Sequence, residues 1–167
     1  GKVAVDDAAR AAIQHLPQVI VSDAAHAAEH SLEVQLPFLQ TVLADFSLLP
    51  LAVGRASPVQ VAEVLECLWG GDETLIVISS DLSHYLPYAV ARDLDADTAR
   101  CIVALDARLD HQQACGATPV NGLLLAARRH GLRAMMIDLR NSGDTAGDRS
   151  RVVGYGAFAF TCEAAHG

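Results

Sequence analysis

Apolar residues along this 167-residue chain follow two patterns that alternate from one end to the other. Some stretches repeat every three or four residues, which predicts amphipathic helices, and others are short uninterrupted runs, which predict buried strands. The predicted helices cover about 6–16, 31–44, 58–68, 89–105 and 118–130; the predicted strands cover 46–53, 74–79, 133–139 and 152–160, with a short extended segment at 17–22. Alternating helices and strands are typical of an α/β protein built from βαβ units.

Several residues mark where these helices begin and end. Ser57 is a predicted N-cap, Pro58 suits the first helical position, and Gln60 completes a capping box. Gly131 predicts the end of the helix that covers 118–130. Pro37 lies inside the second predicted helix and predicts a kink or a break there.

The composition is that of one folded domain spanning 1–167. Hydrophobic residues make up 51% of the chain, which argues against disorder, and a formal net charge of −8 argues against a nucleic-acid-binding surface. No apolar stretch is long enough for a membrane span. The cysteines lack zinc-module spacing, so we expect a cytoplasmic protein with reduced thiols; they are Cys67, Cys101, Cys115 and Cys162. The chain opens at Gly1 rather than Met, as a processed or trimmed piece of a longer protein would.

Asp81 and His84 directly follow the apolar run at 74–79. In open α/β sheets, ligands bind beyond the carboxyl ends of the strands, so this is a candidate site. His84 has two candidate roles there: a general base oriented by Asp81, or a metal ligand. The alternative is that Ser and Asp here cap the next helix and that His84 is merely exposed.

Cys115 precedes Gly116 and the helix that starts near Pro119. The positive end of a helix favours a thiolate, which is both a nucleophile and a metal ligand. The alternative is a small buried apolar residue, the commonest role of a free cysteine. His30 opens another predicted helix, either as part of a polar helix start or as a side chain that projects into a cleft.

The segment 140–151 is a polar loop between two predicted core strands, and long polar loops are often functional. Arg140 or Arg149 would hold an anionic substrate group, or the segment is only a solvated hairpin. The candidates for substrate binding are therefore Arg140, Asn141 and Ser142, together with Ser80 at the end of the 74–79 run.

In order and spacing, these segments resemble the Memo family, also called AmmeMemoRadiSam system protein B. The matching stretches are 29–37 (EHSLEVQLP), 49–54 (LPLAVG), 78–84 (ISSDLSH), Cys115-Gly116 with Pro119, and 152–155 (VVGY). The resemblance implies a three-layer α/β sandwich with a mixed, mostly parallel sheet, related to the class III extradiol dioxygenases, which use non-haem iron.

The resemblance also implies a pocket that binds copper or iron through two histidines and one cysteine. Cys115 matches that cysteine, and His84 matches the pocket histidine that resembles the dioxygenase base, with Asp81 beside it. His30 belongs to a family motif near the pocket. The two metal-binding histidines belong to an N-terminal part of the family that this chain does not match, so the chain should supply one metal ligand of three. A thiolate suits copper(I) or zinc better than an oxygen-activating iron, which argues against ring cleavage.

Three functions remain open from the sequence. The first is a Memo-like metal-binding redox protein that uses Asp81, His84 and Cys115. The second is a non-enzymatic module that binds a peptide or an anion in a vestigial dioxygenase-like pocket. The third is a hydrolase or transferase with Cys115 as nucleophile and His84 as base.

Expected partners follow from the same observations. A small molecule or a peptide is the expected ligand, with no nucleic acid and no membrane. Strands that lack a neighbour expose apolar edge, so we expect association with a missing N-terminal half or with a second copy. The resemblance adds the other proteins of the AmmeMemoRadiSam system as possible partners.

Overall fold

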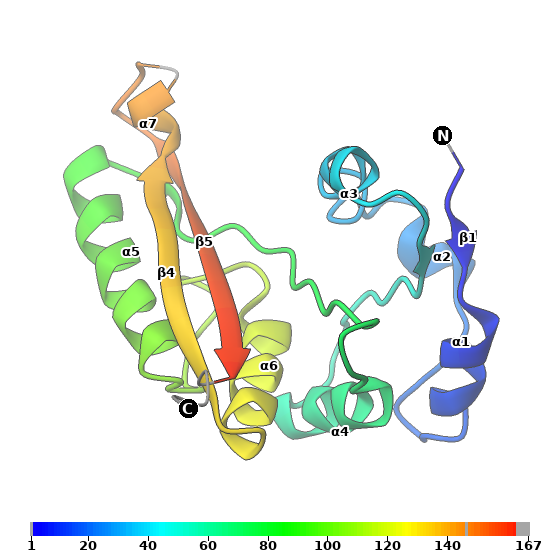
Figure 1. The fold of residues 1–167 in the computed structure, drawn as a ribbon. Helices are drawn as coiled ribbons and strands as arrows, with labels where there is room; N and C mark the ends of the chain where they lie inside the picture. The colour runs from blue at the N-terminus through cyan, green and yellow to red at the C-terminus, as the bar shows by residue number, and fades with distance from the viewer. Residues whose placement is uncertain (1, 146, 163–167) are drawn as a thin grey trace.

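The computed structural model describes residues 2–145 and 147–162 (Figure 1). Its helices are α1 (Asp7–Ile13), α2 (Asp23–His26), α3 (Leu36–Val42), α4 (Pro58–Leu68), α5 (Tyr88–Val103), α6 (Ala117–Arg129) and α7 (Ser142–Thr145); its strands are β1 (Ala4–Val5), β2 (Ser47–Leu48), β3 (His84–Leu86), β4 (Leu132–Asn141) and β5 (Val152–Cys162). The predicted α/β class is confirmed, and the strands form both parallel and antiparallel pairs.

The larger sheet has the strand order β3-β5-β4 and is antiparallel throughout. β4 and β5 form a long hairpin whose register runs from Leu132 opposite Cys162 to Asn141 opposite Gly154, with an irregularity between Met136 and Asp138. β1 and β2 form the parallel pair, and each is two residues long. A mostly parallel sheet is therefore wrong for the part of the chain that the structure describes. The reason is that consecutive strands joined by a short polar segment pair as a hairpin.

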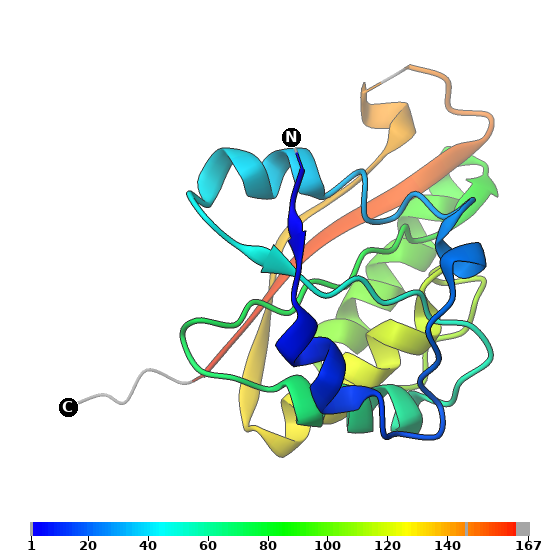
Figure 2. The ribbon, with the colours of Figure 1, turned by 90° about the vertical axis from the view of Figure 1, so that its right-hand side faces the viewer.

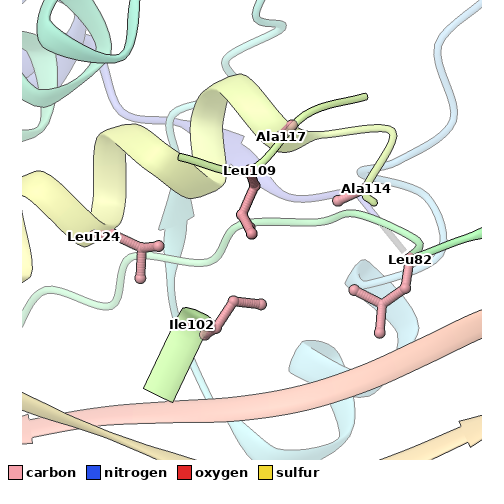
Figure 3. Close-up of a cluster of buried hydrophobic side chains, with 6 residues drawn as sticks. All are labelled: Leu82, Ile102, Leu109, Ala114, Ala117 and Leu124. Carbon is pink, nitrogen blue, oxygen red and sulfur yellow. The ribbon is translucent and has the colours of Figure 1, made fainter. Parts of the chain in front are cut away.

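Helices cover one face of the hairpin. In Figure 1, α5 lies along β4 and β5, and α6 lies between the hairpin and α4. The main core forms where α5 and α6 meet the sheet (Figure 3), and its buried residues are Leu82, Ile102, Leu109, Ala114, Ala117 and Leu124. Figure 2 shows β1, β2 and α3 together on the side away from α5. No helix among the described residues is long and apolar enough to cross a membrane.

The local helix signals are mostly confirmed. The Ser57 hydroxyl accepts the N–H of Gln60, and the Gln60 side chain accepts the N–H of Ser57, so the predicted capping box begins α4. Gly131 follows α6 with a φ of 64°, a conformation that favours glycine. Of the kink or break predicted at Pro37, the structure has the break: residues 31–35 form turns, and α3 begins only at Leu36, with Pro37 in its first turn. A proline is tolerated there, since the first N–H groups of a helix have no acceptor within the helix.

The segment 74–79 is extended but is not a strand, and the predicted strand at 46–53 is reduced to β2. Among the described residues, no backbone hydrogen bond joins 75–80 to another segment. The side chains nevertheless alternate: Ile76 and Ile78 pack against the core, whereas Leu75 is 66% and Val77 46% exposed. The apolar run thus predicts which side chains are buried, but it carries no information on whether a neighbouring strand exists.

Gly154 of β5 lies directly against Asp95 of α5. Its N–H donates to Ser83 O (2.8 Å), and its carbonyl accepts the N–H of Leu82 (2.9 Å). The buried carboxylate of Asp95 lies directly against Gly154, so a Cβ at this position would overlap it. Asp95 Oδ1 also accepts the N–H of Ser83 (3.0 Å), which fixes the chain just before His84.

We expect Gly154→Ala to lower the free energy of unfolding by about 1–3 kcal/mol, because the added methyl forces the Asp95 carboxylate and β5 apart. Urea unfolding followed by circular dichroism measures this. Gly54→Ala is the matched control, since a Cβ there meets nothing within 4 Å, and its effect should stay within about 0.5 kcal/mol. Equal losses in the two variants would contradict the packing argument.

We expect the amides of 75–79 to exchange with deuterium faster than those of the β4–β5 hairpin, on the order of a hundredfold or more. The reason is that the hairpin amides have acceptors across the ladder and those of 75–79 have none in the described chain. Hydrogen-exchange mass spectrometry on peptides from the two regions measures the ratio. Comparable protection would mean that another strand covers 75–79 in solution.

Candidate functional site

The main chain brings Asp81 and Cys115 together. The N–H of Asp81 donates to Cys115 Sγ (3.3 Å), and the N–H of Cys115 donates to the Asp81 carbonyl (3.3 Å). Each residue is the immediate neighbour of a core residue, since Leu82 (4% exposed) follows Asp81 and Ala114 (0%) precedes Cys115. Figure 3 shows Leu82 and Ala114 close together in the same cluster. The core therefore fixes the distance between these two candidate residues.

Ser80 completes this contact. Its hydroxyl lies 3.6 Å from Cys115 Sγ, donates to the Asp81 carbonyl (2.7 Å) and accepts the N–H of Gly116 (2.9 Å). A side chain at Gly116 would come within 2.8 Å of Ser80 Cβ, so glycine permits the close approach of the two segments. The predicted site residues Ser80, Asp81 and Cys115 thus meet at one point.

Cys115 is exposed, so it is not the small buried residue of the alternative interpretation. α6 begins two residues later, at Ala117 with Gly116 as its N-cap, so Cys115 precedes a helix as the sequence predicts. The sulfur accepts one main-chain N–H, and such a donor stabilises negative charge on its acceptor. The same sulfur lies 3.8 Å from the Asp81 carbonyl, and its exposed position leaves it accessible to a ligand.

His84 and Asp81 form a partly exposed pair. His84 Nε2 lies 3.5 Å from Asp81 Oδ2, and the two side chains are 32% and 47% exposed. α5 begins only at Tyr88, after Pro87, so Asp81 does not cap it. Both side chains reach solvent, so a bound molecule could contact either of them.

Tyr85 follows His84 in a strained conformation. Its φ is 57°, unusual for a residue with a side chain, and it occupies the irregular position between the His84 and Leu86 pairings of β3 with β5. Its ring meets the His84 ring edge-on at 5.8 Å, and the Arg151 guanidinium lies 5.0 Å above it. Nothing in the sequence pattern pointed to Tyr85 or Arg151, since backbone strain and a cation–π contact appear only in three dimensions.

His111 was also missed as a neighbour of the site. Its Nδ1 lies 3.2 Å from the Cys115 carbonyl, so this imidazole helps to hold the turn before α6. In the sequence, only the spacing of four residues between His111 and Cys115 indicates this contact. The indication is weak, because residues four apart come together only in a helix or a turn.

The segment 29–37 reaches the site through Gln35 rather than through His30. Gln35 Nε2 donates to Ser79 Oγ (3.1 Å), at the end of the 74–79 run. His30 is exposed, and its N–H donates to Glu29 Oε1 (2.8 Å). The N–H groups of Ser31 and His30 together hold the pKa of Glu29 below its usual value. No described contact joins the His30 side chain to Asp81, His84 or Cys115.

Arg140, Asn141 and Ser142 make local contacts where β4 ends. Arg140 Nε pairs with Asp138 (2.6 Å), which lowers the pKa of that carboxyl, and the Asn141 N–H donates to Asp144 (2.9 Å). Ser142 Oγ accepts the N–H of Val153 (3.1 Å). These contacts close the turn into β5, so part of the predicted loop is strand and part is α7.

A cavity of about 200 Å³ lies beside this turn. It is lined by Tyr88, Arg92, Asp95, Ala96, Leu139, Arg140, Asn141 and Asp144. The Tyr88 hydroxyl donates to Asp144 (2.6 Å), which lowers the pKa of the carboxyl and raises that of the phenol. None of the residues that meet at Cys115 lines this cavity, so the two groups of predicted site residues occupy different places.

The residues that the structure describes contain no cluster of three or more His, Cys, Asp or Glu side chains placed to hold a metal ion. Cys115 and the Asp81–His84 pair are close, but they do not form such a cluster. A cysteine sulfur suits a soft metal ion, but these side chains are too few to form a complete metal site.

Comparison with known proteins identifies the family. The family model for Memo-like proteins matches residues 1–159. Among similar curated proteins, the MEMO1 family protein of Archaeoglobus fulgidus is 33% identical over 162 residues, which cover 89% of this chain and 62% of the relative. That of Methanosarcina barkeri is 37% identical, covering 83% and 58%, and that of Aquifex aeolicus is 36% identical, covering 93% and 62%. The chain thus spans about three fifths of the length of these relatives, and it belongs to the Memo family.

Proposed function

We propose that this chain carries one side of a Memo-type metal site, in which Cys115 supplies a thiolate ligand and the Asp81–His84 pair binds and exchanges a proton beside it. The observation that carries the proposal is the contact of Cys115 Sγ with the main-chain N–H of Asp81 (3.3 Å), three residues before His84. An exposed sulfur and the partly exposed Asp81–His84 pair thereby lie close together.

Cys115 is the first step of the argument. It is exposed, it lies on rigid chain between Ala114 in the core and the start of α6, and its sulfur faces a main-chain donor. A thiolate ligand favours copper(I) or zinc over the iron of oxygen-activating sites. When bound, such a metal would supply redox or Lewis-acid chemistry; the chain itself would contribute one sulfur to it.

The Asp81–His84 pair is the second step. His84 Nε2 lies 3.5 Å from Asp81 Oδ2, and a neighbouring carboxylate of this kind can orient an imidazole. Residue 83 is tied to Gly154 and Asp95, so His84 starts from a fixed backbone position. We propose that His84 accepts a proton from a ligand at Cys115 and that Asp81 holds the ring.

The remaining metal ligands would come from outside the described residues, because this part of the chain brings no three such side chains together. The relatives are longer than this chain, so a further polypeptide segment is the proposed source. A cytoplasmic location and the other proteins of the AmmeMemoRadiSam system as partners remain predictions from the sequence and the resemblance.

The two other functions have less support. A hydrolase needs His84 to activate Cys115, but His84 contacts Asp81, and no hydrogen bond joins the imidazole to the sulfur in the described chain. A peptide- or anion-binding module would use Arg140 and its neighbours, yet Arg140 is paired with Asp138 and Asn141 with Asp144.

Anaerobic titration with copper(I), in competition with a chromogenic copper(I) chelator, tests the proposal. We expect near-stoichiometric binding, and a loss in Cys115→Ser larger than the roughly 10–100-fold that follows from removing a group that merely supports a ligand. Iron(II), titrated in the same way, should bind more weakly.

Cys67→Ser is the matched control, since Cys67 is a second exposed cysteine, on α4. Its copper(I) affinity should equal that of the unaltered chain. If Cys115→Ser also binds with unchanged affinity, Cys115 is not the ligand and the proposal fails.

A further inference from the structure

We propose that Tyr85 is a positioning residue of the candidate site, which holds the His84 imidazole in one orientation beside Asp81. The inference rests on the proposed function, in which His84 accepts a proton, and it names the residue that sets the orientation of that imidazole. Its evidence is a β-bulge, a strained backbone angle and two ring contacts.

Tyr85 is the extra residue of the bulge. His84 lies opposite Val153 and Leu86 opposite Val152, so Tyr85 stands between two pairs of the ladder. Paired residues of antiparallel strands share a face, and consecutive residues such as Val152 and Val153 point to opposite faces. His84 and Leu86 therefore point to opposite faces, although residues two apart in an uninterrupted strand share one.

The bulge decides which face of the sheet receives the imidazole. Val152 is fully buried, and Leu86 points to its face. His84 points to the other face and keeps 32% of its side chain exposed. Bulges that re-aim a side chain in this way are frequent next to active sites.

The backbone of Tyr85 is strained. Its φ is 57°, which a residue with a Cβ adopts only at an energetic cost. Such a conformation persists where the surrounding structure holds it, and here both sides are held: Ser83 is hydrogen bonded to Gly154 and Asp95, and Leu86 is paired with β5. Glycine would adopt this φ without the cost, so a tyrosine at this position points to a use for its ring.

The Tyr85 ring contacts both His84 and Arg151. The ring centroids of Tyr85 and His84 are 5.8 Å apart with 62° between the planes, an edge-on arrangement that aromatic pairs prefer. Arg151 Cζ lies 5.0 Å from the Tyr85 ring centroid, and a cation is attracted to the face of such a ring. Tyr85 is 63% exposed, so these contacts hold the ring rather than burial.

Asp81 alone is a weak restraint on the imidazole. Its Oδ2 lies 3.5 Å from His84 Nε2, which is longer than a normal hydrogen bond between nitrogen and oxygen. Both side chains are partly exposed, so water competes for the same groups. The edge-on contact with Tyr85 supplies the second restraint that a single orientation requires.

NMR of the His84 side chain tests the proposal directly. Three-bond couplings from His84 Cγ to its backbone nitrogen and carbonyl carbon report whether one χ1 rotamer is populated. We expect one rotamer in the unaltered chain and in Tyr85→Phe, which keeps the ring, and an average over several in Tyr85→Ala. Tyr155→Ala is the matched control: Tyr155 is an exposed tyrosine of β5 that pairs with Arg140, so its loss should leave the His84 couplings unchanged.

Tyr85→Gly separates the ring from the strained backbone. It should release the imidazole as Tyr85→Ala does, because both variants lack the ring. Its unfolding equilibrium constant should nevertheless be about fivefold smaller than that of Tyr85→Ala, since glycine adopts the positive φ without cost. A purely structural role for Tyr85 would change unfolding in these variants and leave the rotamer of His84 unchanged.

Modification of histidine by diethyl pyrocarbonate, followed peptide by peptide with mass spectrometry, gives a second measurement. The rate at His84 should rise about two- to tenfold in Tyr85→Ala, the factor that corresponds to the loss of one edge-on aromatic contact. Arg151→Gln should raise it about two- to fivefold, because the ring loses the cation above it. His111, on the turn before α6, should react at the same rate in every variant.

Two results would overturn the proposal. One is a single His84 rotamer in folded Tyr85→Ala and Tyr85→Gly, with an unchanged rate of modification. The other is rotamer averaging that is already complete in the unaltered chain. Neither experiment measures copper(I) binding, so unchanged copper(I) affinity in Cys115→Ser would remove the proposed metal ligand and leave the result for Tyr85 standing.

Discussion

The contact between Gly154 and Asp95 holds the sheet, the long helix α5 and the candidate site in one arrangement. Two main-chain hydrogen bonds tie Gly154 to Leu82 and Ser83, and the Asp95 carboxylate binds the Ser83 N–H from the other side. The buried Asp95 carboxylate fits here only because Gly154, which it lies against, has no side chain. The position of His84 in β3 therefore depends on Gly154 in the neighbouring strand β5.

From this anchor the site extends mainly through main-chain contacts. Asp81 and Cys115 exchange hydrogen bonds that involve both backbones and the sulfur, and Ser80 bridges them to Gly116. Main-chain atoms keep their positions largely independently of the side chain attached to them. The distance between Asp81 and Cys115 is therefore set by the fold. The side chains of Asp81, His84 and Cys115 are then free to bind a ligand, because none of them is needed as a core residue.

The parts of the fold that the sequence predicted are those decided by local chemistry. The capping box of α4, the glycine after α6 and the two strands of the hairpin follow from signals within a few residues. The pairing of strands is not local: an apolar run is the same whether its neighbour is parallel, antiparallel or absent, so 74–79 was predicted as a strand. For the site, the sequence shows that Ser80 and Asp81 end an apolar run and that Cys115 precedes a helix, two features that mark them as candidates. The contacts of Gln35 and His111, by contrast, depend on how distant turns pack.

The two open edges of this chain differ in a way that separates their roles. At 74–79 the exposed side chains are Leu75 and Val77, and the segment leads directly into Ser79 and the site, so whatever pairs there also reaches Cys115. At β4 the exposed side chains are Met135, Met136 and Ile137, and this strand lies at the far side of the sheet from β3. A strand that joined 74–79 would therefore bring its own side chains close to Cys115, at the point where Ser80 and Asp81 contact the sulfur.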